Sequence, residues 1–392
     1  MKKNNKIFYG KQFLDNSDIK SVTKALKSNY LSQGPINKKL EEKFKTYFDV
    51  KHALTCSSGT AALHLAFLAI GIKKNDYVLM PSVNFIASYN LCKSLGAKII
   101  LIDVDCLTGQ IRVDEIFKKL KKLKKIKVKA IVNMMNGGYP QNLEDFYTLK
   151  NKLNCYLIDD SCHALGANYI YKGKIKKIGS CKHTDISTFS LHPLKSITSG
   201  EGGIITTNNS KIADLIKSYR SHGLSKDNKR YWIYSLSNYG FNFRLSEIGA
   251  SLALSQLRKI HKFIKKRKKI AKIYLKNLSN YKNFIDFPKY QQFENSSFHL
   301  LLIHLDFKKF KYDKDHFFQF LNKKDIYPQF HYTPIYRLDK NINVKIKEYP
   351  GSEKYLKSAI SLPIYYNLNI IDQNYVIRQI LNYIKIFKKN KK

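Results

Sequence analysis

The chain has 392 residues, of which 44% are apolar and 13% aromatic, so it can bury a substantial core and should be ordered over most of its length. Its formal net charge of +41 comes from 62 lysines and eight arginines against 29 acidic residues. No segment approaches the roughly 18 apolar residues of a membrane span, and the start MKKNNKIFYGKQ lacks the apolar part of a signal peptide. Six scattered cysteines show no CxxC pair and no zinc-ligand spacing, which indicates a protein of the reducing cytoplasm.

The positive charge makes nucleic acid and membrane surfaces candidate partners. The lysines, however, are spread over the whole length, and the clusters at 118–129 and 265–269 fall where solvated helix faces or helix ends are expected. Arginine, which is well suited to reading bases and phosphates, is scarce. We therefore expect neither partner and favour an enzyme with small anionic substrates; a nucleic-acid-binding protein is the alternative.

Short apolar segments alternate with helical patterns and predict strands at 77–82, 98–105, 129–136, 155–162, 186–191 and 202–209. Several of them lack polar alternation, which is typical of strands covered on both faces. Strands separated by helices form parallel sheets with crossover connections. The predicted fold class is therefore α/β, with a mostly parallel sheet and flanking helices.

From about Leu245 the pattern predicts one long helix, in which Ala253, Leu257, Ile260 and Ile264 form a single apolar face. This helix should lead into a second domain with mixed strand and helix signals, including the apolar segment 298–307. We predict a large domain at 1–250 and a smaller C-terminal α+β domain at 251–392.

Residues 56–72, CSSGTAALHLAFLAIGI, combine a turn of small residues at 57–59 with an apolar helix that should run until Gly71. Thr60 is a candidate cap for this helix. Unpaired amides and the positive end of the helix dipole attract anions, so the turn is a candidate phosphate site. Many buried helices begin in the same way, and a purely structural turn is the alternative.

Asp159 and Asp160 stand at the carboxyl end of a predicted strand, in LIDDSCHALG at 157–166. Open α/β sheets bind ligands at that end. A carboxylate buried there needs a cationic partner. The alternative is a helix N-cap with a lysine nearby.

Lys195 lies in SLHPLKSITSGEGG, residues 190–203, directly after another predicted strand. The glycines let the backbone approach a ligand closely, and a lysine beside an anion site and a buried carboxylate can lose its proton and attack a carbonyl. A phosphate cradle, a carboxylate and an amine nucleophile are what pyridoxal phosphate (PLP) needs, because the carboxylate keeps the ring nitrogen protonated. A solvated surface lysine is the alternative for Lys195 taken alone.

Seven segments, taken in chain order, resemble the DegT/StrS sugar aminotransferases over nearly the whole chain. They are SSGTAAL, PSVNFIAS, LIDDSCHALGA, FSLHPLKSITSGEGG, YGFNFRLSEIGASLALSQL, FHYTPIY and SLPIY. Within that family, FYGKQFLDNSDI with LSQGP, the HPLK before Lys195 and SHGL at 221–224 look most similar to the transaminases of pseudaminic acid synthesis. The resemblance implies the PLP-dependent transferase fold of type I.

The resemblance also implies a role for each matching residue. Lys195 would bond covalently to PLP and act as general base, and Asp160, rather than Asp159, would face the pyridine nitrogen. The implied contacts of the remaining parts of the cofactor are Gly59, Thr60 and Ser190 with the phosphate, Phe85 with the ring face and His163 with the ring hydroxyl.

Further positions imply a partner subunit and a substrate. Asn242 matches an asparagine that reaches the cofactor phosphate of the neighbouring subunit, so a homodimer with shared active sites is expected. Arg244, His331 and Tyr332 match positions near the nucleotide-sugar; a surface ion pair is the alternative for Arg244, and a structural histidine for His331. The implied substrates are a UDP-linked 4-keto-6-deoxy-N-acetylhexosamine and glutamate.

The chain also departs from the pattern of the family. It carries VNMMNGGYP at 132–140 where relatives usually have VHxxG, and Asn84 where threonine is common, so the sugar pocket should differ. An aminotransferase of another nucleotide keto sugar, of the legionaminic, bacillosamine or perosamine type, is one alternative. A PLP-dependent sugar dehydratase, in which histidine replaces the lysine, is another, and Lys195 argues against it.

Overall fold

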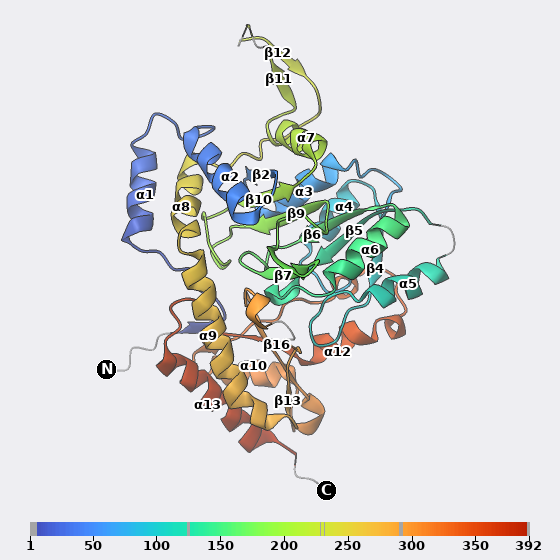
Figure 1. The fold of residues 1–392 in the computed structure, drawn as a ribbon. Helices are drawn as coiled ribbons and strands as arrows, with labels where there is room; N and C mark the ends of the chain where they lie inside the picture. Colours follow the sequence, from blue (N-terminus) through green and yellow to red (C-terminus); the bar gives the residue numbers. More distant parts are fainter. Residues whose placement is uncertain (1–5, 124–125, 228, 231, 290–292, 390–392) are drawn as a thin grey trace.

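The computed structural model describes residues 6–123, 126–227, 229–230, 232–289 and 293–389. Figure 1 shows a large sheet flanked by helices, a hairpin that projects at the top, and the C-terminal helices below. The strands are β1 (Ile7–Phe8), β2 (His52–Cys56), β3 (Tyr77–Pro81), β4 (Lys98–Ile102), β5 (Val128–Met134), β6 (Tyr156–Asp160), β7 (Asn168–Tyr171), β8 (Lys174–Lys177), β9 (Ile186–Ser190), β10 (Gly203–Thr207), β11 (Leu224–Lys226), β12 (Tyr234–Leu236), β13 (Ile285–Asp286), β14 (Leu301–Leu305), β15 (Ile326–Tyr327) and β16 (Ala359–Leu362). The α-helices are α1 (Asn16–Leu26), α2 (Pro35–Phe48), α3 (Gly59–Ala69), α4 (Ala87–Ser94), α5 (Val113–Lys122), α6 (Leu143–Leu153), α7 (Ser210–Arg220), α8 (Glu247–Leu257), α9 (Ile260–Leu278), α10 (Lys314–Asn322), α11 (Ile335–Leu338), α12 (Pro350–Ser358) and α13 (Ile370–Phe387).

Seven strands form the central sheet in the order β2-β10-β9-β6-β5-β3-β4. Neighbouring strands from β9 to β4 pair in parallel, and β10 runs antiparallel to both β2 and β9. The predicted, mostly parallel sheet is thus confirmed, and each of the six segments predicted as strands contains one. The sequence patterns did not predict β2, whose five residues HALTC mix polar and apolar side chains.

The sheet is buried on both faces, which explains its nearly continuous apolar strands. Val78 and Ile158 belong to a core that they form with α3, α4 and α7. Their strand neighbours Leu79 and Leu157 belong to a second core, formed with α5 and α6. Because successive strand residues point to opposite faces, both cores need apolar side chains.

The single helix predicted from about Leu245 is wrong in one respect, because the structure has two helices, α8 and α9. The helix is interrupted at Arg258 and Lys259, where Lys259 pairs with Asp15 at 2.9 Å and Asp18 at 2.7 Å, next to α1. The dihedral angles of Lys259, φ −102° and ψ −3°, stay near the helical region. The apolar face therefore continues across the break, and its four predicted residues are buried.

The C-terminal part contains the three-stranded antiparallel sheet β13-β14-β16, and β14 lies in the predicted apolar segment 298–307. Its core also takes Ile7 from β1, which pairs in parallel with β15. The predicted division at 250/251 falls inside α8 and stays a prediction. Within the described part of the chain, none of the helices has the length and apolar character needed to span a membrane.

Candidate active site

Several strand ends meet at one edge of the central sheet. Cys56 of β2 and Ser190 of β9 both pair with Gly203, the first residue of β10. Asp160, the last residue of β6, lies beside Thr188 of β9. The loops that leave these strands contribute to a pocket of about 540 Å³, so distant motifs of the sequence come together here.

Nine of the eleven predicted site residues line this pocket: Gly59, Thr60, Phe85, Asp160, His163, Ser190, Lys195, His331 and Tyr332. Ten further lining residues were not predicted as site residues: Tyr9, Ser58, Leu63, Ala87, Met134, Cys162, His192, Glu201, Gln329 and Phe330. All ten lie inside or next to the quoted motifs, but no residue-level pattern marks their side chains as pocket-facing.

Lys195 is carried by the loop at 191–202, which backbone hydrogen bonds close at both ends. Its own amide donates to the carbonyl of His192 at 2.9 Å. Burial lowers the pKa of the Lys195 amine, and the neighbouring Cys162 and Asp160 partly oppose this shift. The amine therefore releases its proton more easily than a surface lysine does.

Ser58, and not Thr60, caps α3. The helix begins at Gly59, two residues earlier than a Thr60 cap would allow, and Ser58 Oγ accepts from the Ala61 amide at 3.0 Å. The amides of Gly59 and Thr60 have no hydrogen-bond partner among the described residues. A Cβ on Gly59 would lie 2.8 Å from Cβ of Ser190, so only glycine allows this close approach. The free amides and the Ser190 hydroxyl fit the phosphate of PLP.

Asp160 is buried in the wall of the pocket. The alternative of a helix N-cap is wrong, because the turn after β6 contains no α-helix; Asp160 Oδ1 instead accepts from the Cys162 amide at 3.2 Å. Burial raises the pKa of Asp160, while hydrogen bonds from Cys162 and the charge of Lys195 lower it. A pyridinium nitrogen would supply a further opposite charge to this carboxyl, in addition to that of Lys195.

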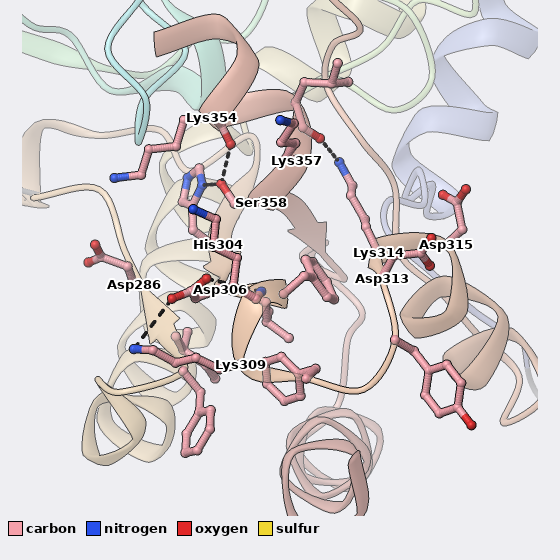
Figure 2. Close-up of a pocket in the computed structure, with 18 of the residues that line it drawn as sticks. Asp286, His304, Asp306, Lys309, Asp313, Lys314, Asp315, Lys354, Lys357 and Ser358 are labelled. Atoms are coloured by element: carbon pink, nitrogen blue, oxygen red, sulfur yellow. Dashed lines mark hydrogen bonds and ion pairs between the residues drawn. The ribbon is translucent and has the colours of Figure 1, made fainter. Parts of the chain in front are cut away.

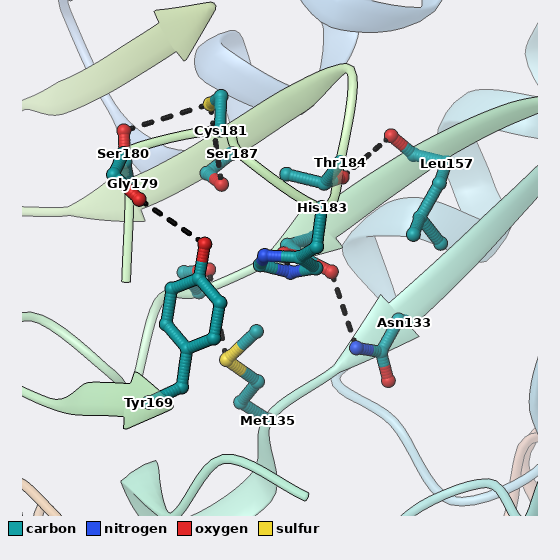
Figure 3. A network of polar contacts seen from close by, with 12 residues as sticks. Asn133, Met135, Leu157, Tyr169, Gly179, Ser180, Cys181, His183, Thr184 and Ser187 are labelled. Carbon is teal, nitrogen blue, oxygen red and sulfur yellow. Dashed lines mark hydrogen bonds and ion pairs between the residues drawn. The ribbon is translucent and has the colours of Figure 1, made fainter. Parts of the chain in front are cut away.

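Asp159 has a separate set of partners, His183 and Asn133, which are labelled in Figure 3. Its Oδ2 lies 2.7 Å from Nε2 of His183, and its Oδ1 accepts from Nδ2 of Asn133 at 3.1 Å. The Asp159 and His183 side chains are fully buried. The partner is thus a histidine and not the lysine of the sequence-based alternative.

His163 lies between the loop after β5 and Tyr332. The Gly137 amide donates to His163 Nδ1 at 3.3 Å, and Nε2 lies 3.0 Å from the Tyr332 hydroxyl. Burial lowers the pKa of His163 well below its ordinary value, and the charge of Lys195 lowers it further. Burial likewise lowers the pKa of His331 to about 3. Both imidazoles are therefore uncharged at neutral pH.

The glycine pair at 137–138 yields a stability prediction. Gly138 has φ +84°, and a Cβ there would clash with Ser297 Oγ and with the carbonyl oxygen of His163. Gly138→Ala should therefore lower the free energy of unfolding by roughly 2–4 kcal/mol, measured by chemical denaturation. Gly173→Ala is the matched control, because Gly173 has φ +72° with nothing within 4 Å of the added Cβ. It should cost only about 1 kcal/mol, and equal losses would contradict the packing argument.

Asn242 and Arg244 do not line the pocket of the single chain. Asn242 is exposed and Arg244 half-buried, on the segment after the β11–β12 hairpin. The Ser57 amide donates to the carbonyl of Phe243 at 2.8 Å, so this segment passes beside the turn before α3. The Nε of Arg244 is buried without a hydrogen-bond partner in the described residues.

A larger cavity of about 1270 Å³ lies in the C-terminal part (Figure 2). Its buried polar groups are already paired: His304 lies 2.9 Å from Ser358 Oγ and 2.8 Å from the Leu107 carbonyl, and the Lys314 amine donates to the Leu356 carbonyl at 2.8 Å. None of the predicted site residues lines it. The smaller pocket, with Lys195, is therefore the candidate active site.

Known proteins share this sequence and this fold. Residues 12–381 match the DegT/DnrJ/EryC1/StrS aminotransferase family. A UDP-4-amino-4,6-dideoxy-N-acetyl-beta-L-altrosamine transaminase of Campylobacter jejuni subsp. jejuni serotype O:23/36 (strain 81-176) is 34% identical over 98% of this chain and 99% of its own. A GDP-perosamine synthase of Escherichia coli O157:H7 is 36% identical over 63% of this chain and 64% of its own.

A solved structure agrees with these sequence matches. It is that of Helicobacter pylori PseC, described as an aminotransferase involved in the biosynthesis of pseudoaminic acid; its TM-score is 0.86 at 29% identity, covering 97% of this chain and 100% of that one. The predicted fold class is confirmed by this likeness. With the family match spanning nearly the whole length, the chain belongs to the DegT/DnrJ/EryC1/StrS aminotransferase family.

Proposed function

We propose that this aminotransferase uses PLP to move an amino group from glutamate to a UDP-linked 4-keto-6-deoxy-N-acetylhexosamine. The observation that carries the proposal is the meeting of Lys195, the buried Asp160 and the free amides at the start of α3 in one pocket. The Campylobacter jejuni relative, which aligns over 98% of this chain and is named for a UDP-linked amino sugar, supports the substrate class.

PLP, when bound, supplies an electron sink for the charge released when a proton leaves the carbon beside the amine. Lys195 would hold the cofactor and then, displaced by the substrate amine, carry the proton from the donor carbon to the cofactor and back. Its lowered pKa suits this exchange, because the buried amine gives up its proton more readily than an ordinary lysine does. Asp160 would keep the proton on the ring nitrogen.

The other pocket residues would bind and orient. In this proposal the phosphate is held by Gly59, Thr60 and Ser190, Phe85 stacks on the ring and His163 approaches the ring hydroxyl, while Arg244, His331 and Tyr332 contact the nucleotide-sugar. Phe85 is 52% exposed and its ring centroid lies 5.7 Å from that of Tyr332, so its face is available for a ligand in the pocket.

We also propose a cytoplasmic homodimer in which Asn242 reaches the cofactor phosphate of the second copy. The β11–β12 hairpin before Asn242 projects from the body of the chain (Figure 1). It exposes Trp232 by 61%, Tyr234 by 52% and Leu236 by 60%, and large apolar side chains gathered on a projection favour burial against a partner. The six free cysteines favour a reducing compartment.

The two half-reactions test the proposed function directly. Glutamate alone should bleach the visible absorbance of the PLP-loaded enzyme and release one equivalent of 2-oxoglutarate per site. Adding the UDP-linked 4-keto-6-deoxy-N-acetylhexosamine should then restore the absorbance, and NMR of the product should place the new amine on C4.

The same experiment separates the alternatives. A GDP-linked 4-keto-6-deoxyhexose serves as the control sugar, because it tests the perosamine-type hypothesis. Faster turnover of that sugar, or an amine on C3, would contradict the proposed substrate. No bleaching by glutamate would contradict a transaminase of this donor, and loss of a sugar hydroxyl without amination would indicate a dehydratase.

A further inference from the structure

The neutral ring of His163 carries its proton on Nε2. The Gly137 amide donates to Nδ1 at 3.3 Å, and a nitrogen that accepts this bond holds no proton of its own in the neutral ring. The ring is only 1% exposed, and the ring of His299 packs against it at a centroid distance of 4.3 Å. Ser297 Oγ also donates to the His163 carbonyl at 2.8 Å. The surroundings therefore fix both the orientation of the ring and its tautomer.

Tyr332 is the acceptor of the remaining proton of His163. Nε2 and the Tyr332 hydroxyl oxygen are 3.0 Å apart, and Nε2 is the donor once Nδ1 accepts from Gly137. The hydroxyl hydrogen of Tyr332 must then point elsewhere, and it has no acceptor among the described residues. Burial raises the pKa of Tyr332 well above its ordinary value, so the hydrogen stays on the oxygen at neutral pH.

Tyr332 belongs to the same pocket as the Lys195 amine. Tyr332 and Lys195 both line it, with Phe85 beside the Tyr332 ring at 5.7 Å between centroids. An uncharged donor without a partner, next to the buried His163, is suited to an oxygen that gains negative charge during reaction. A ketone has such an oxygen, because electrons move onto it when its carbon is attacked by an amine.

We propose that the Tyr332 hydroxyl donates a hydrogen bond to the carbonyl oxygen of the keto substrate, and that His163 is the positioning residue that directs this hydroxyl. The inference rests on the proposed function and deepens it. The proposal also gives a role to Gly137 in VNMMNGGYP. A Cβ at this position would lie 2.6 Å from the Tyr139 hydroxyl, so only glycine can place its amide where it donates to His163.

Single-turnover kinetics test this chain of hydrogen bonds from Gly137 through His163 to Tyr332, which we call the relay. Starting from the pyridoxamine phosphate form of the full-length enzyme, Tyr332→Phe should slow reaction with the keto sugar by about 10²-fold. His163→Asn, whose shorter amide can accept from Gly137 but not reach Tyr332, should slow it similarly, and the double variant should be no slower than either single one. His163→Gln, whose longer amide can present a donor to Tyr332, should recover most of the rate. If the rate losses of the two single variants multiplied in the double variant, the relay would be overturned. It would also be overturned if the rate did not recover in His163→Gln.

The tautomer can be measured without cofactor or substrate. In protein labelled with ¹⁵N-histidine, the signal that disappears in His163→Gln should show a protonated Nε2 and an unprotonated Nδ1. The opposite tautomer would overturn the inference even in an active enzyme. If the wild-type enzyme aminated no keto sugar, the proposed function would fail, whereas this spectrum would still decide how His163 is protonated, and the two failures are thus distinguishable.

Discussion

Lys195→Ala should lower the turnover number by a factor on the order of 10⁴ or more, the largest loss expected from any single substitution. The variant loses both the amine that would bind PLP and the base that would move the proton. The PLP-loaded variant should also lack the visible absorbance of a lysine-bound cofactor. Borohydride reduction followed by peptide mapping should label Lys195 in the wild type and leave the corresponding peptide of the variant unlabelled.

Lys211→Ala is the matched control for this substitution. Lys211 is exposed on α7, so its removal should change neither turnover nor absorbance. The cofactor-free Lys195→Ala protein should remain folded, because the loop at 191–202 is closed by backbone hydrogen bonds rather than by the amine. Wild-type turnover in Lys195→Ala, or borohydride labelling at another lysine, would remove the basis of the proposed function.

Asp160→Asn should lower turnover by roughly 10²–10³-fold while preserving the shape of the pocket, because it removes the charge that keeps the ring nitrogen protonated. Stopped-flow absorbance with glutamate should locate the loss in the proton-transfer step. The same substitution at the exposed Asp214, Asp214→Asn, is the control and should leave the rate unchanged.

A cofactor analogue with a permanently charged, alkylated ring nitrogen should restore part of the activity of Asp160→Ala, because the smaller alanine side chain leaves room for the alkyl group.

Stability separates this catalytic loss from misfolding. The pKa of Asp160 is raised in the folded protein, so ionisation of the carboxyl opposes folding above the pKa of the unfolded chain. At pH 7 the cofactor-free Asp160→Asn protein should therefore unfold at a temperature no lower than the wild type, which thermal denaturation measures. A lower unfolding temperature together with lost activity would mean that Asp160 supports the fold and not the reaction.

Much of the site could be predicted because its chemistry lies in short motifs at strand ends. The strands that end at Asp160 and Ser190 were visible as apolar segments, and parallel strands bring their carboxyl ends to one edge. The roles of Asn242 and Arg244 remain predictions, since neither lines the pocket of one chain.

The errors arise where a short-range pattern allows two local structures. Ser58 and Thr60 are both good caps, and only the start of α3 at Gly59 decides between them. The break between α8 and α9 is hidden because the apolar face continues through it. The pairing of Asp159 with His183 and the contact of His163 with Gly137 depend on distances between separate segments. Periodicity carries no information about such contacts.

The pairing of β1 with β15 has a consequence for the order in which the enzyme is assembled. Tyr9, which follows β1, lines the pocket, yet Ile7 pairs with Ile326, a residue that leaves the ribosome roughly 300 positions later. A nascent chain can thus build its central sheet early, but its catalytic centre has no complete wall until synthesis is nearly finished. Prematurely terminated chains lacking β15 should accordingly be inert even when most of the chain has folded.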